Sequence, residues 1–428
     1  MNLFDAIALL LVGTAFAAYV NHRLFRLPHT IGVALAALLG SLFVVLFDLL
    51  MPSLELAKGV VNFVNGLEFA DTLLQGMLSF LLFAGALHVD LDRLAERKWP
   101  IALLATAGVV ISTFVVAGIV YLGFKIIDQP IPFIWCLAFG ALISPTDPVA
   151  TLGILKSLRV PPSVAAKIAG ESLFNDGVGV VVFIVILGIA SGGNAGDGAA
   201  EIAIFAGEIF ALEAIGGALL GLVSGYLCFL ALASVDDHLV EILLTLALCT
   251  GVYALASSLH LSGPIAVVIA GLLIGNQGVD RAMTDHTRDN LLRFWELSDE
   301  ILNSVLFMLL GMEAIVVGLS HELLLAGIIA IVAMIAGRVV SVTAVLTAFR
   351  HTNDFDKGAA KALIWGGLKG GISVALALSL PENEAKSILI GMTYTAVIFS
   401  LLAQGLTLQK VLKRAFRDVD RNPNSLGN

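Results

Sequence analysis

Two short segments of the chain carry ionisable and hydroxyl side chains inside runs that are otherwise apolar. They read Ser-Pro-Thr-Asp-Pro at 144–148 and Gly-Glu-Ser-Leu-Phe-Asn-Asp-Gly at 170–177. Carboxylate, hydroxyl, amide and carbonyl oxygens are the ligands that hard cations prefer. Together the segments indicate an all-oxygen site for an alkali cation, provided that the surrounding helices bring them together.

The first segment predicts an interrupted helix. Pro145 and Pro148 each lack an amide donor, so each frees a carbonyl one turn earlier. Such a backbone is tolerated at membrane depth only where it is buried in protein or lines an aqueous cavity, and unwound segments supply carbonyl ligands to cations in transporters. We interpret the segment as a functional break around Asp147. The alternative is a proline kink capped by Ser144 and Thr146.

The second segment places all its polar groups on one side of a helix. Starting from Glu171, the side chains of Ser172, Asn175 and Asp176 fall within an arc of about 140°. Ser172 and Asp176 lie one turn apart, so that a hydroxyl and a carboxylate can contact the same ion. The alternative is a polar stripe that only holds helices together.

The two carboxylates of this segment are expected to differ in role. Arg338 is a cation in an apolar run, where a charge costs about 2.5–3.5 kcal/mol on insertion scales and usually has a partner. Pairing with Glu171 would neutralise both groups and leave Asp176 available. Burial disfavours the charged form of a carboxylate and a nearby cation favours it. Asp176 would therefore bind either a proton or a cation, and that competition is a transport mechanism.

A third motif lies in the second half of the chain. Four glycines, Gly367 and Gly370 among them, surround Lys369 in the run from Trp365 to Ser373. Such a cluster predicts a second helix break or a close helix crossing. One interrupted segment in each half is typical of inverted-repeat transporters. Lys369 would either balance the negative ends of half-helices or extend its ammonium group to the membrane surface.

The elements that must position these residues are membrane-spanning helices. Of 428 residues, 58% are hydrophobic and 13% charged, whereas soluble domains carry roughly 25% charged residues. Apolar runs recur along the chain, and most are long enough to cross about 30 Å of hydrocarbon as a helix. We expect an all-α polytopic membrane protein of about thirteen spans, at roughly 4–20, 30–50, 72–89, 101–124, 133–154, 165–190, 202–232, 239–258, 264–276, 300–319, 323–349, 360–380 and 387–409.

The basic residues predict the orientation of these spans. Nineteen of the 24 Lys and Arg residues fall on one side of the membrane, three fall on the other, and Arg338 and Lys369 lie inside spans. Because cytoplasmic loops carry the excess of basic residues, we expect the N-terminus outside and the C-terminus in the cytoplasm. Residues 1–5 are expected to begin an uncleaved first span. Residues 283–298 are expected to form an amphipathic helix at the membrane surface, with an ordinary loop as the alternative.

The motifs at 144–148, 170–177 and 366–370 resemble those of the cation:proton antiporter-1 family, and within it the prokaryotic NhaP-type sodium/proton antiporters. The resemblance covers nearly the whole chain. It implies a homodimer in the bacterial or archaeal plasma membrane, with two unwound helices that cross at the ion site. It also implies two units in each protomer and a cytoplasmic tail: a core (transport) domain at approximately 72–190 and 300–380, a dimerisation domain at approximately 1–70, 202–276 and 387–412, and the tail at 413–428.

The resemblance also implies the roles of single residues at the cation site. Asp176 matches the essential ion-binding aspartate. Ser172 and the backbone of Thr146 match further sodium ligands, and Asp147 matches a contributor that acts largely through water. Asn175 matches a residue that bridges the unwound segments.

Outside this set, Glu171 with Arg338 matches a structural ion pair of the family. The chain departs from the family pattern in two places. Residues 83–87 read Phe-Ala-Gly-Ala-Leu where many relatives have Phe-Glu-Gly-Gly-Leu, so a carboxylate is missing at Ala84. Lys369 stands where arginine is common, which retains the charge but not the bidentate fork.

We therefore expect a secondary transporter, not an enzyme, that exchanges sodium for a proton. With Asp176 as one titrating site, exchange would be one for one and without net charge movement. Potassium or lithium in place of sodium, and a cation channel with the same fold, are the alternatives. The expected partners are the transported ions, the lipid bilayer and a second copy of the chain.

Several other classes of protein are disfavoured by the sequence. A net charge of −9 does not favour nucleic acid, and the three cysteines form no metal or disulfide framework. An intramembrane aspartyl protease would need YD and GxGD motifs, a zinc peptidase would need HExxH and an ATPase would need a Walker A loop; the chain contains none of these. We expect no cofactor and no use of ATP.

Overall fold

The computed structural model describes residues 3–51, 58–60, 76–89, 98–147, 151, 162–190, 204, 207–208, 211–278, 282–317, 321–349 and 358–416. This part of the chain is helical and contains no β-strand. In chain order its α-helices and short π-helical segments (η) are α1 (Leu3–Val20), η1 (Asn21–Phe25), α2 (His29–Leu50), α5 (Leu78–Leu87), α7 (Lys98–Ala105), α8 (Ala107–Ile126), α9 (Phe133–Ile143), α11 (Pro162–Ala190), η4 (Ala211–Ile215), α13 (Gly216–Leu232), α14 (His238–Ser258), α15 (Gly263–Leu273), η5 (Ile274–Gly278), α17 (Asp285–Val317), α18 (His321–Ala348), α19 (Ala359–Gly366), α20 (Gly371–Leu378), α21 (Lys386–Phe399), η6 (Ser400–Gly405) and α22 (Leu406–Ala415).

The helices have the lengths that a membrane requires. Among the described residues, eight helical stretches are long and apolar enough to cross a membrane, and the bent pair α19 and α20 makes a ninth. The four other expected spans overlap α5, α9 and α15, which are shorter, and α17. The all-α polytopic fold is thus confirmed, whereas the number thirteen stays a prediction.

Polar residues mark the starts of two helices, α14 and α15. Asp237 precedes α14, and its carboxylate accepts hydrogen bonds from the amides of Leu239 and Val240 at 2.9 and 3.3 Å. Ser262 precedes α15 in the same way, with Pro264 in the first turn. Both patterns satisfy amide groups that have no partner within the helix.

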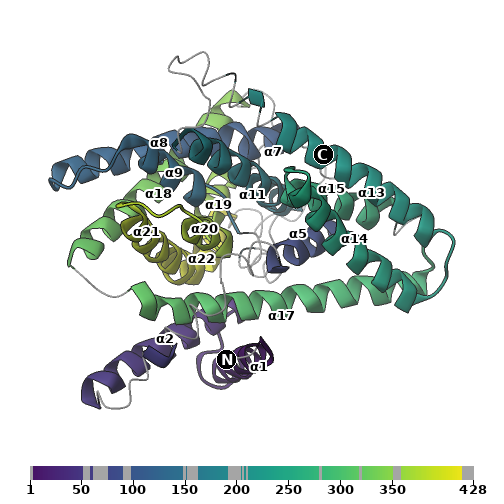
Figure 1. Ribbon diagram of the computed structural model, residues 1–428, viewed down its shortest axis with the longest axis horizontal. Helices are drawn as coiled ribbons and strands as arrows, with labels where there is room; N and C mark the ends of the chain where they lie inside the picture. The colour runs from purple at the N-terminus through teal and green to yellow at the C-terminus, as the bar shows by residue number, and fades with distance from the viewer. Residues whose placement is uncertain are drawn as a thin grey trace.

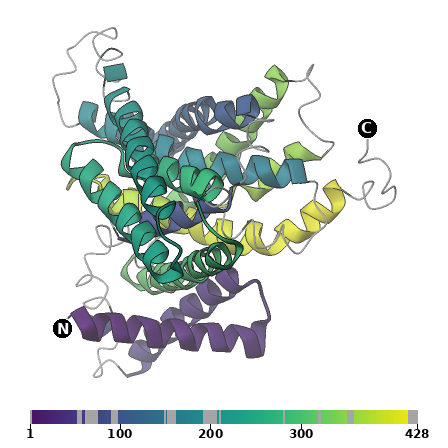
Figure 2. The same ribbon diagram turned by 90° about the vertical axis from the view of Figure 1, so that its right-hand side faces the viewer.

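The helices form two groups and a separate layer around α17 (Figure 1). One group contains α8, α9, α11 and α18 to α22, in which α18 packs on α8 and α21, and α9 packs on α8 and α11. The other contains α5, α13, α14 and α15, with α15 in contact with each of the other three. Helices α1 and α2 pack on the opposite side of α17, and they appear as a separate lower layer in Figure 2. Helix α17 therefore lies between this layer and the two groups.

The prediction of a surface helix at 283–298 is wrong in one respect, because this helix is not separate from the span that follows it. Helix α17 is continuous over 33 residues and joins that segment to the expected span at 300–319. The run contains no proline to interrupt it, and its length of about 50 Å exceeds the hydrocarbon thickness. One helix can therefore begin in the polar region and end within the membrane.

The first half of α17 also packs on protein, not only on lipid. Trp295 is fully buried, and its ring Nε1 donates a hydrogen bond to Thr245 Oγ1 of α14 at 3.0 Å. Its ring lies 4.7 Å from that of Phe83 on α5, measured between centroids. The indole thus joins α17 to two helices of the second group.

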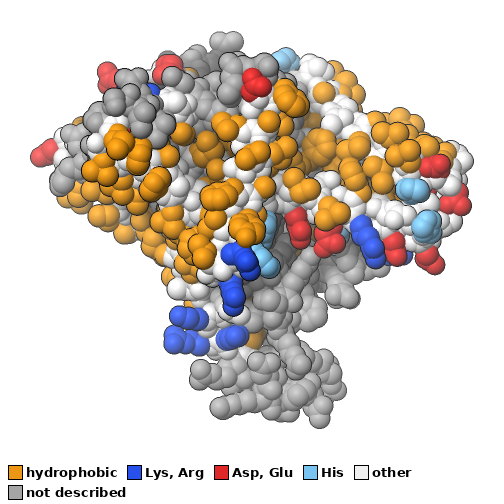
Figure 3. All heavy atoms as spheres, turned by 90° about the horizontal axis from the view of Figure 1, so that it is seen from below, with side chains coloured by type: hydrophobic (Ala, Val, Ile, Leu, Met, Phe, Trp, Pro, Cys, Tyr) orange, Lys and Arg blue, Asp and Glu red, His pale blue; other side chains and the backbone are white. Residues whose placement is uncertain are grey.

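The outer surface is that of an integral membrane protein. Figure 3 shows hydrophobic side chains over much of the face that contains α1, α2 and α17, with charged side chains mostly toward its edges. Phe4, Phe16 and Leu24 are each more than two-thirds exposed, which is costly in water but not in hydrocarbon. Together with the lengths of the helices, this surface indicates a multi-pass membrane protein.

The anchoring role of Trp295 generates a prediction about stability. Trp295→Ala removes a buried indole and a hydrogen bond, and we expect the free energy of unfolding to fall by about 3–5 kcal/mol. Leu297→Ala is the matched control, because the Leu297 side chain is 59% exposed on the same helix. Thermal unfolding in detergent measures both variants. Equal midpoints for the two would show that α17 does not depend on this contact.

Candidate ion-binding site

The site forms where two helices stop part-way through the protein. Helix α9 ends at Ile143, and residues 144–147 are not helical; Pro148 lies outside the described residues. Helix α19 ends at Gly366 and α20 begins at Gly371, with a bend of 42° between them. The end of α9 thus lies just before Pro145, and the glycine cluster lies at the bend between α19 and α20.

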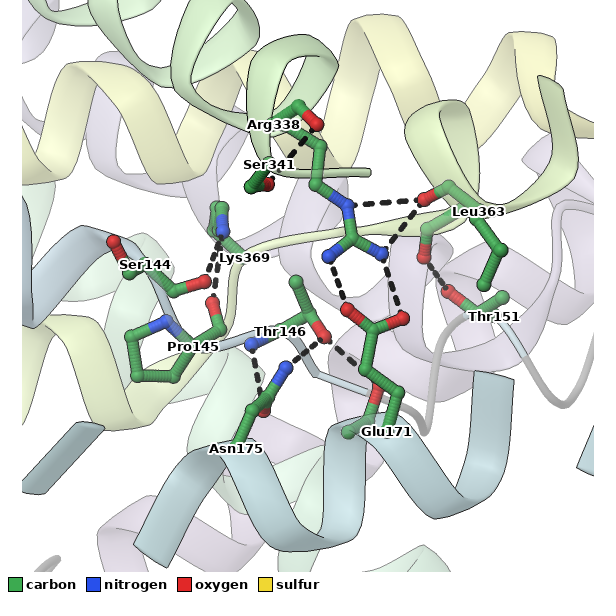
Figure 4. A network of polar contacts seen from close by, with 12 residues as sticks. Ser144, Pro145, Thr146, Thr151, Glu171, Asn175, Arg338, Ser341, Leu363 and Lys369 are labelled. Atoms are coloured by element: carbon green, nitrogen blue, oxygen red, sulfur yellow. Dashed lines mark hydrogen bonds and ion pairs between the residues drawn. The ribbon is translucent and has the colours of Figure 1, made fainter. Parts of the chain in front are cut away.

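The two breaks contact each other directly. The Asp147 amide donates a hydrogen bond to the Leu368 carbonyl at 2.8 Å. The Lys369 ammonium donates to the carbonyls of Ser144 and Pro145, each at 2.9 Å, as Figure 4 shows. Lys369 is 2% exposed, so the idea that it extends to the membrane surface is wrong. Its charge instead balances the negative end of α9.

Two glycines allow this close approach. A Cβ atom at Gly370 would lie 2.1 Å from Asp147 Oδ2, and one at Gly367 would lie 2.5 Å from Arg338 Nε. Either contact would force the backbone and the charged side chain apart. Gly370 and Gly367 are therefore required because the backbone of the second break lies directly against the side chains of Asp147 and Arg338.

Helix α11 supplies the polar groups that face the first break. Thr146 donates its amide to Asn175 Oδ1 at 3.2 Å, and Asn175 Nδ2 donates to Thr146 Oγ1 at 2.8 Å. The hydroxyl oxygens of Thr146 and Ser172 lie 2.9 Å apart. All three residues are at most 2% exposed. Pro145 packs its ring against the backbone of Gly179 on the same helix, so the break is held along two turns of α11.

Asp176 follows Ser172 by one turn of α11 and is 3% exposed. Asp147 and Lys369 are charged groups close enough to influence it. Among the described residues, Asp176 has no ion pair of the kind that Arg338 forms with Glu171. The structure thus brings Asp147, Asp176 and Lys369 together, next to the hydroxyl groups of Thr146 and Ser172.

Glu171 is neutralised by an arginine fork. Arg338 on α18 donates Nη1 to Glu171 Oε1, and donates Nη2 to Oε2 at 2.9 Å. The same guanidinium donates Nε and Nη2 to the Leu363 carbonyl at 3.0 and 2.8 Å, near the end of α19 (Figure 4). The expected pair is therefore present, and it also binds the C-terminal end of a half-helix.

Some members of the site give no signal in the sequence. Thr151 donates its hydroxyl to the Gly366 carbonyl at 2.8 Å, and so completes the end of α19. The carbonyls of Leu363 and Leu368 accept hydrogen bonds from Arg338 and from the Asp147 amide. Every residue has a backbone carbonyl, so no pattern of side chains could have identified the carbonyls of Leu363 and Leu368.

The donor set fits a monovalent cation better than a transition metal. Within the described ranges, no group of three or more His, Cys, Asp or Glu side chains could hold a metal ion. Ala84 is buried in an apolar cluster with Phe83 and Leu87 and supplies no side-chain oxygen. The candidate ligands remain the oxygens of Asp176, Ser172, Thr146 and Asp147 that the sequence predicts.

The Arg338 fork leads to a prediction about folding. Arg338→Ala leaves the buried Glu171 carboxylate without its cation, and we expect a loss of about 3–5 kcal/mol in the free energy of unfolding. Glu171→Gln combined with Arg338→Met removes both charges and should lose less, because neither charge is then left unpaired. Thermal unfolding in detergent compares the two. The interpretation fails if the double variant is as unstable as Arg338→Ala.

Known proteins resemble this chain over nearly its whole length. The family model described as "Sodium/hydrogen exchanger, transmembrane" matches residues 8–414. The Na(+)/H(+) antiporter NhaP of Pseudomonas aeruginosa is 46% identical over 419 residues, 97% of each chain. The Na(+)/H(+) antiporter NhaH of Halobacillus dabanensis is 32% identical over 95% of this chain and 96% of its own.

A solved structure has the same fold. The sodium proton antiporter MjNhaP1 of Methanocaldococcus jannaschii superposes with a TM-score of 0.74 over 97% of this chain and 99% of its own, at 20% identity. The family match covers nearly the whole chain, and it includes both helix breaks and α11. The chain is therefore a member of the sodium/hydrogen exchanger family of membrane transporters.

Proposed function

We propose that this protein is a secondary antiporter that exchanges sodium ions for protons at Asp176. The observation that carries the proposal is the contrast between two neighbouring carboxylates of α11. Arg338 neutralises Glu171, whereas Asp176 is buried beside the oxygens of the first break without such a partner among the described residues. The names of the relatives, which are sodium/proton antiporters, support the same ions.

Sodium would be bound by oxygens from two elements. Asp176 and Ser172 come from α11, and Thr146 and Asp147 come from the break after α9. Because Asn175 donates to Thr146 Oγ1, the Thr146 hydroxyl can donate to Ser172, which leaves a lone pair of Ser172 for the cation. A bound proton on Asp176 removes the negative charge that the cation needs, so the two ions compete.

The local charges support exchange without net charge movement. Glu171 and Arg338 cancel, and Lys369 offsets one of the two carboxylates Asp147 and Asp176. One sodium ion or one proton then makes the site neutral. The sodium-bound and the protonated states therefore carry the same charge across the membrane. We infer a stoichiometry of one for one. The groups that hold the breaks in place, Lys369 and Arg338, keep their carbonyl partners in both states.

Alternating access requires one group of helices to move against another. The packing favours a division that differs from the one expected at 72–190 and 300–380. Helix α5 packs on α15, and α21 packs on α18 and α20. We propose a moving unit of α7, α8, α9, α11 and α18 to α22, and a scaffold of α1, α2, α5, α13 to α15 and α17. The scaffold would form the homodimer.

The orientation expected from the basic residues belongs to the same proposal. Many of the Lys and Arg side chains visible in Figure 3 gather toward one edge of the hydrophobic surface. Lys410, Lys413 and Arg414 are exposed on α22. Because basic residues accumulate on the cytoplasmic side, this edge would face the cytoplasm.

Asp176→Asn tests the role of the carboxylate. The amide cannot alternate between a proton and a cation, so sodium-dependent proton flux in proteoliposomes should fall by at least about 100-fold, to the level of empty vesicles. Glu208→Gln is the matched control, because Glu208 is an exposed carboxylate in the membrane region. Flux that survives in Asp176→Asn, measured with a fluorescent pH probe, would exclude the mechanism. Potassium, lithium and choline, added in turn, discriminate the alternative substrates.

The charge balance of the site predicts how flux responds to voltage. Clamping the membrane potential with potassium and valinomycin should leave the initial rate of sodium-driven proton flux unchanged, because no net charge crosses. A rate that changes with the imposed potential would contradict one-for-one exchange. A steady current at fixed pH would instead indicate a cation channel.

A further inference from the structure

We propose that Ser400 is a positioning residue for the cation site, acting through the backbone of Lys369. The inference rests on the proposed sodium/proton exchange. Ser400 is fully buried at the junction of α21 and η6. Its Oγ accepts a hydrogen bond from the Lys369 amide at 2.9 Å. This contact joins α21 to the middle of the second break.

Ser400 differs from the two threonines of its helix. Thr393 and Thr395 donate to carbonyls four residues earlier, Leu389 at 2.7 Å and Gly391 at 2.8 Å. That is the usual behaviour of hydroxyl groups inside helices. Ser400 instead accepts a hydrogen bond from another segment. It begins the π-helical turn η6, and such wide turns occur often at functional sites.

The Lys369 amide needs this acceptor because its own segment provides none. Residues 367–370 are not helical, so the amide is not paired within a helix. Lys369 is 2% exposed, and a buried amide without a partner is strongly disfavoured. The hydroxyl of Ser400 therefore determines where the backbone of Lys369 rests.

Two contacts link the position of the Lys369 backbone to the proposed cation ligands. The Lys369 ammonium holds the carbonyls of Ser144 and Pro145 at 2.9 Å. The next residue, Thr146, contacts Ser172 through its hydroxyl. A displaced Lys369 backbone would displace these carbonyls, and with them Thr146. Sodium needs several oxygens at fixed distances, whereas a proton needs only the Asp176 carboxylate, so the loss falls mainly on sodium.

Ser400→Ala tests this inference through kinetics. We expect the KM for sodium to rise about five-fold, the effect of one hydrogen bond, with kcat within about two-fold of wild type. Because sodium then competes less well with protons, the pH of half-maximal exchange should shift by about half a unit to the alkaline side at fixed sodium. Ser400→Thr retains the acceptor and should restore both values. Thr393→Val removes a buried hydroxyl from the same helix and should behave as wild type.

Hydrogen exchange of the Lys369 amide provides a readout that does not depend on transport. The amide should exchange at least about ten-fold faster in Ser400→Ala than in wild type, and at the wild-type rate in Thr393→Val. Ser400→Cys, whose sulfur is a weaker acceptor, serves if the alanine variant does not fold. Its sodium KM and its amide exchange rate should both be higher than those of wild type, and unchanged values would overturn the inference.

The outcomes separate this inference from the proposed function. Wild-type protein that exchanges no cation would overturn the proposed function, and the amide measurement would still decide the role of Ser400. Active wild type with an unchanged sodium KM in Ser400→Ala would overturn the role of Ser400 alone. A fall in kcat without a shift in the pH profile, not rescued by threonine, would show that Ser400 only stabilises the fold.

Discussion

Helices that stop inside a membrane leave carbonyl groups without amide partners, and the hydrocarbon supplies no water to replace them. The rest of this structure depends on how those carbonyls are satisfied. Lys369 binds the end of α9, and Arg338 and Thr151 bind the end of α19. Each donor comes from a segment other than the one it completes. The two breaks therefore exist only as a pair, and α11 and α18 must lie beside them.

The same interactions decide which charges remain available for an ion. A guanidinium that binds a carboxylate and a carbonyl at once is fixed in place. Glu171 is therefore occupied by its ion pair with Arg338. Lys369 is held by two carbonyls and therefore acts on Asp176 from a distance. Structural cations thus set the charge of the site without occupying it. This separation of holding groups from binding groups leaves Glu171 paired with Arg338, whereas Asp176, further along α11, has no arginine partner among the described residues.

Much of the site could be predicted from the sequence because its residues are conspicuous. Prolines and charges inside apolar runs are costly, so Pro145, Asp176 and Arg338 stand out wherever they occur. Ser400 does not, since a single serine in an apolar helix has an ordinary use in bonding to its own backbone. The Leu363 and Leu368 carbonyls carry no side-chain signal at all.

The fold was predictable to a similar depth. Hydropathy locates each apolar run, but the charges in the first half of α17 conceal that this helix is continuous. Nor does hydropathy say which helices touch, because lipid and protein both accept an apolar surface. The packing of α5 on α15 and of α21 on α18 therefore required the three-dimensional structure.

The hydrogen bond between the Asp147 amide and the Leu368 carbonyl has a consequence for how such a site can change over time. Both atoms belong to the main chain, so the bond survives replacement of either side chain. The exception is proline at position 147, which has no amide hydrogen to donate. Ancestral substitutions could therefore have altered the acidity and the selectivity of the site while the crossing stayed intact. The contact is invisible to alanine scanning for the same reason. Apart from that proline, only an ester in place of the Asp147 amide would remove it.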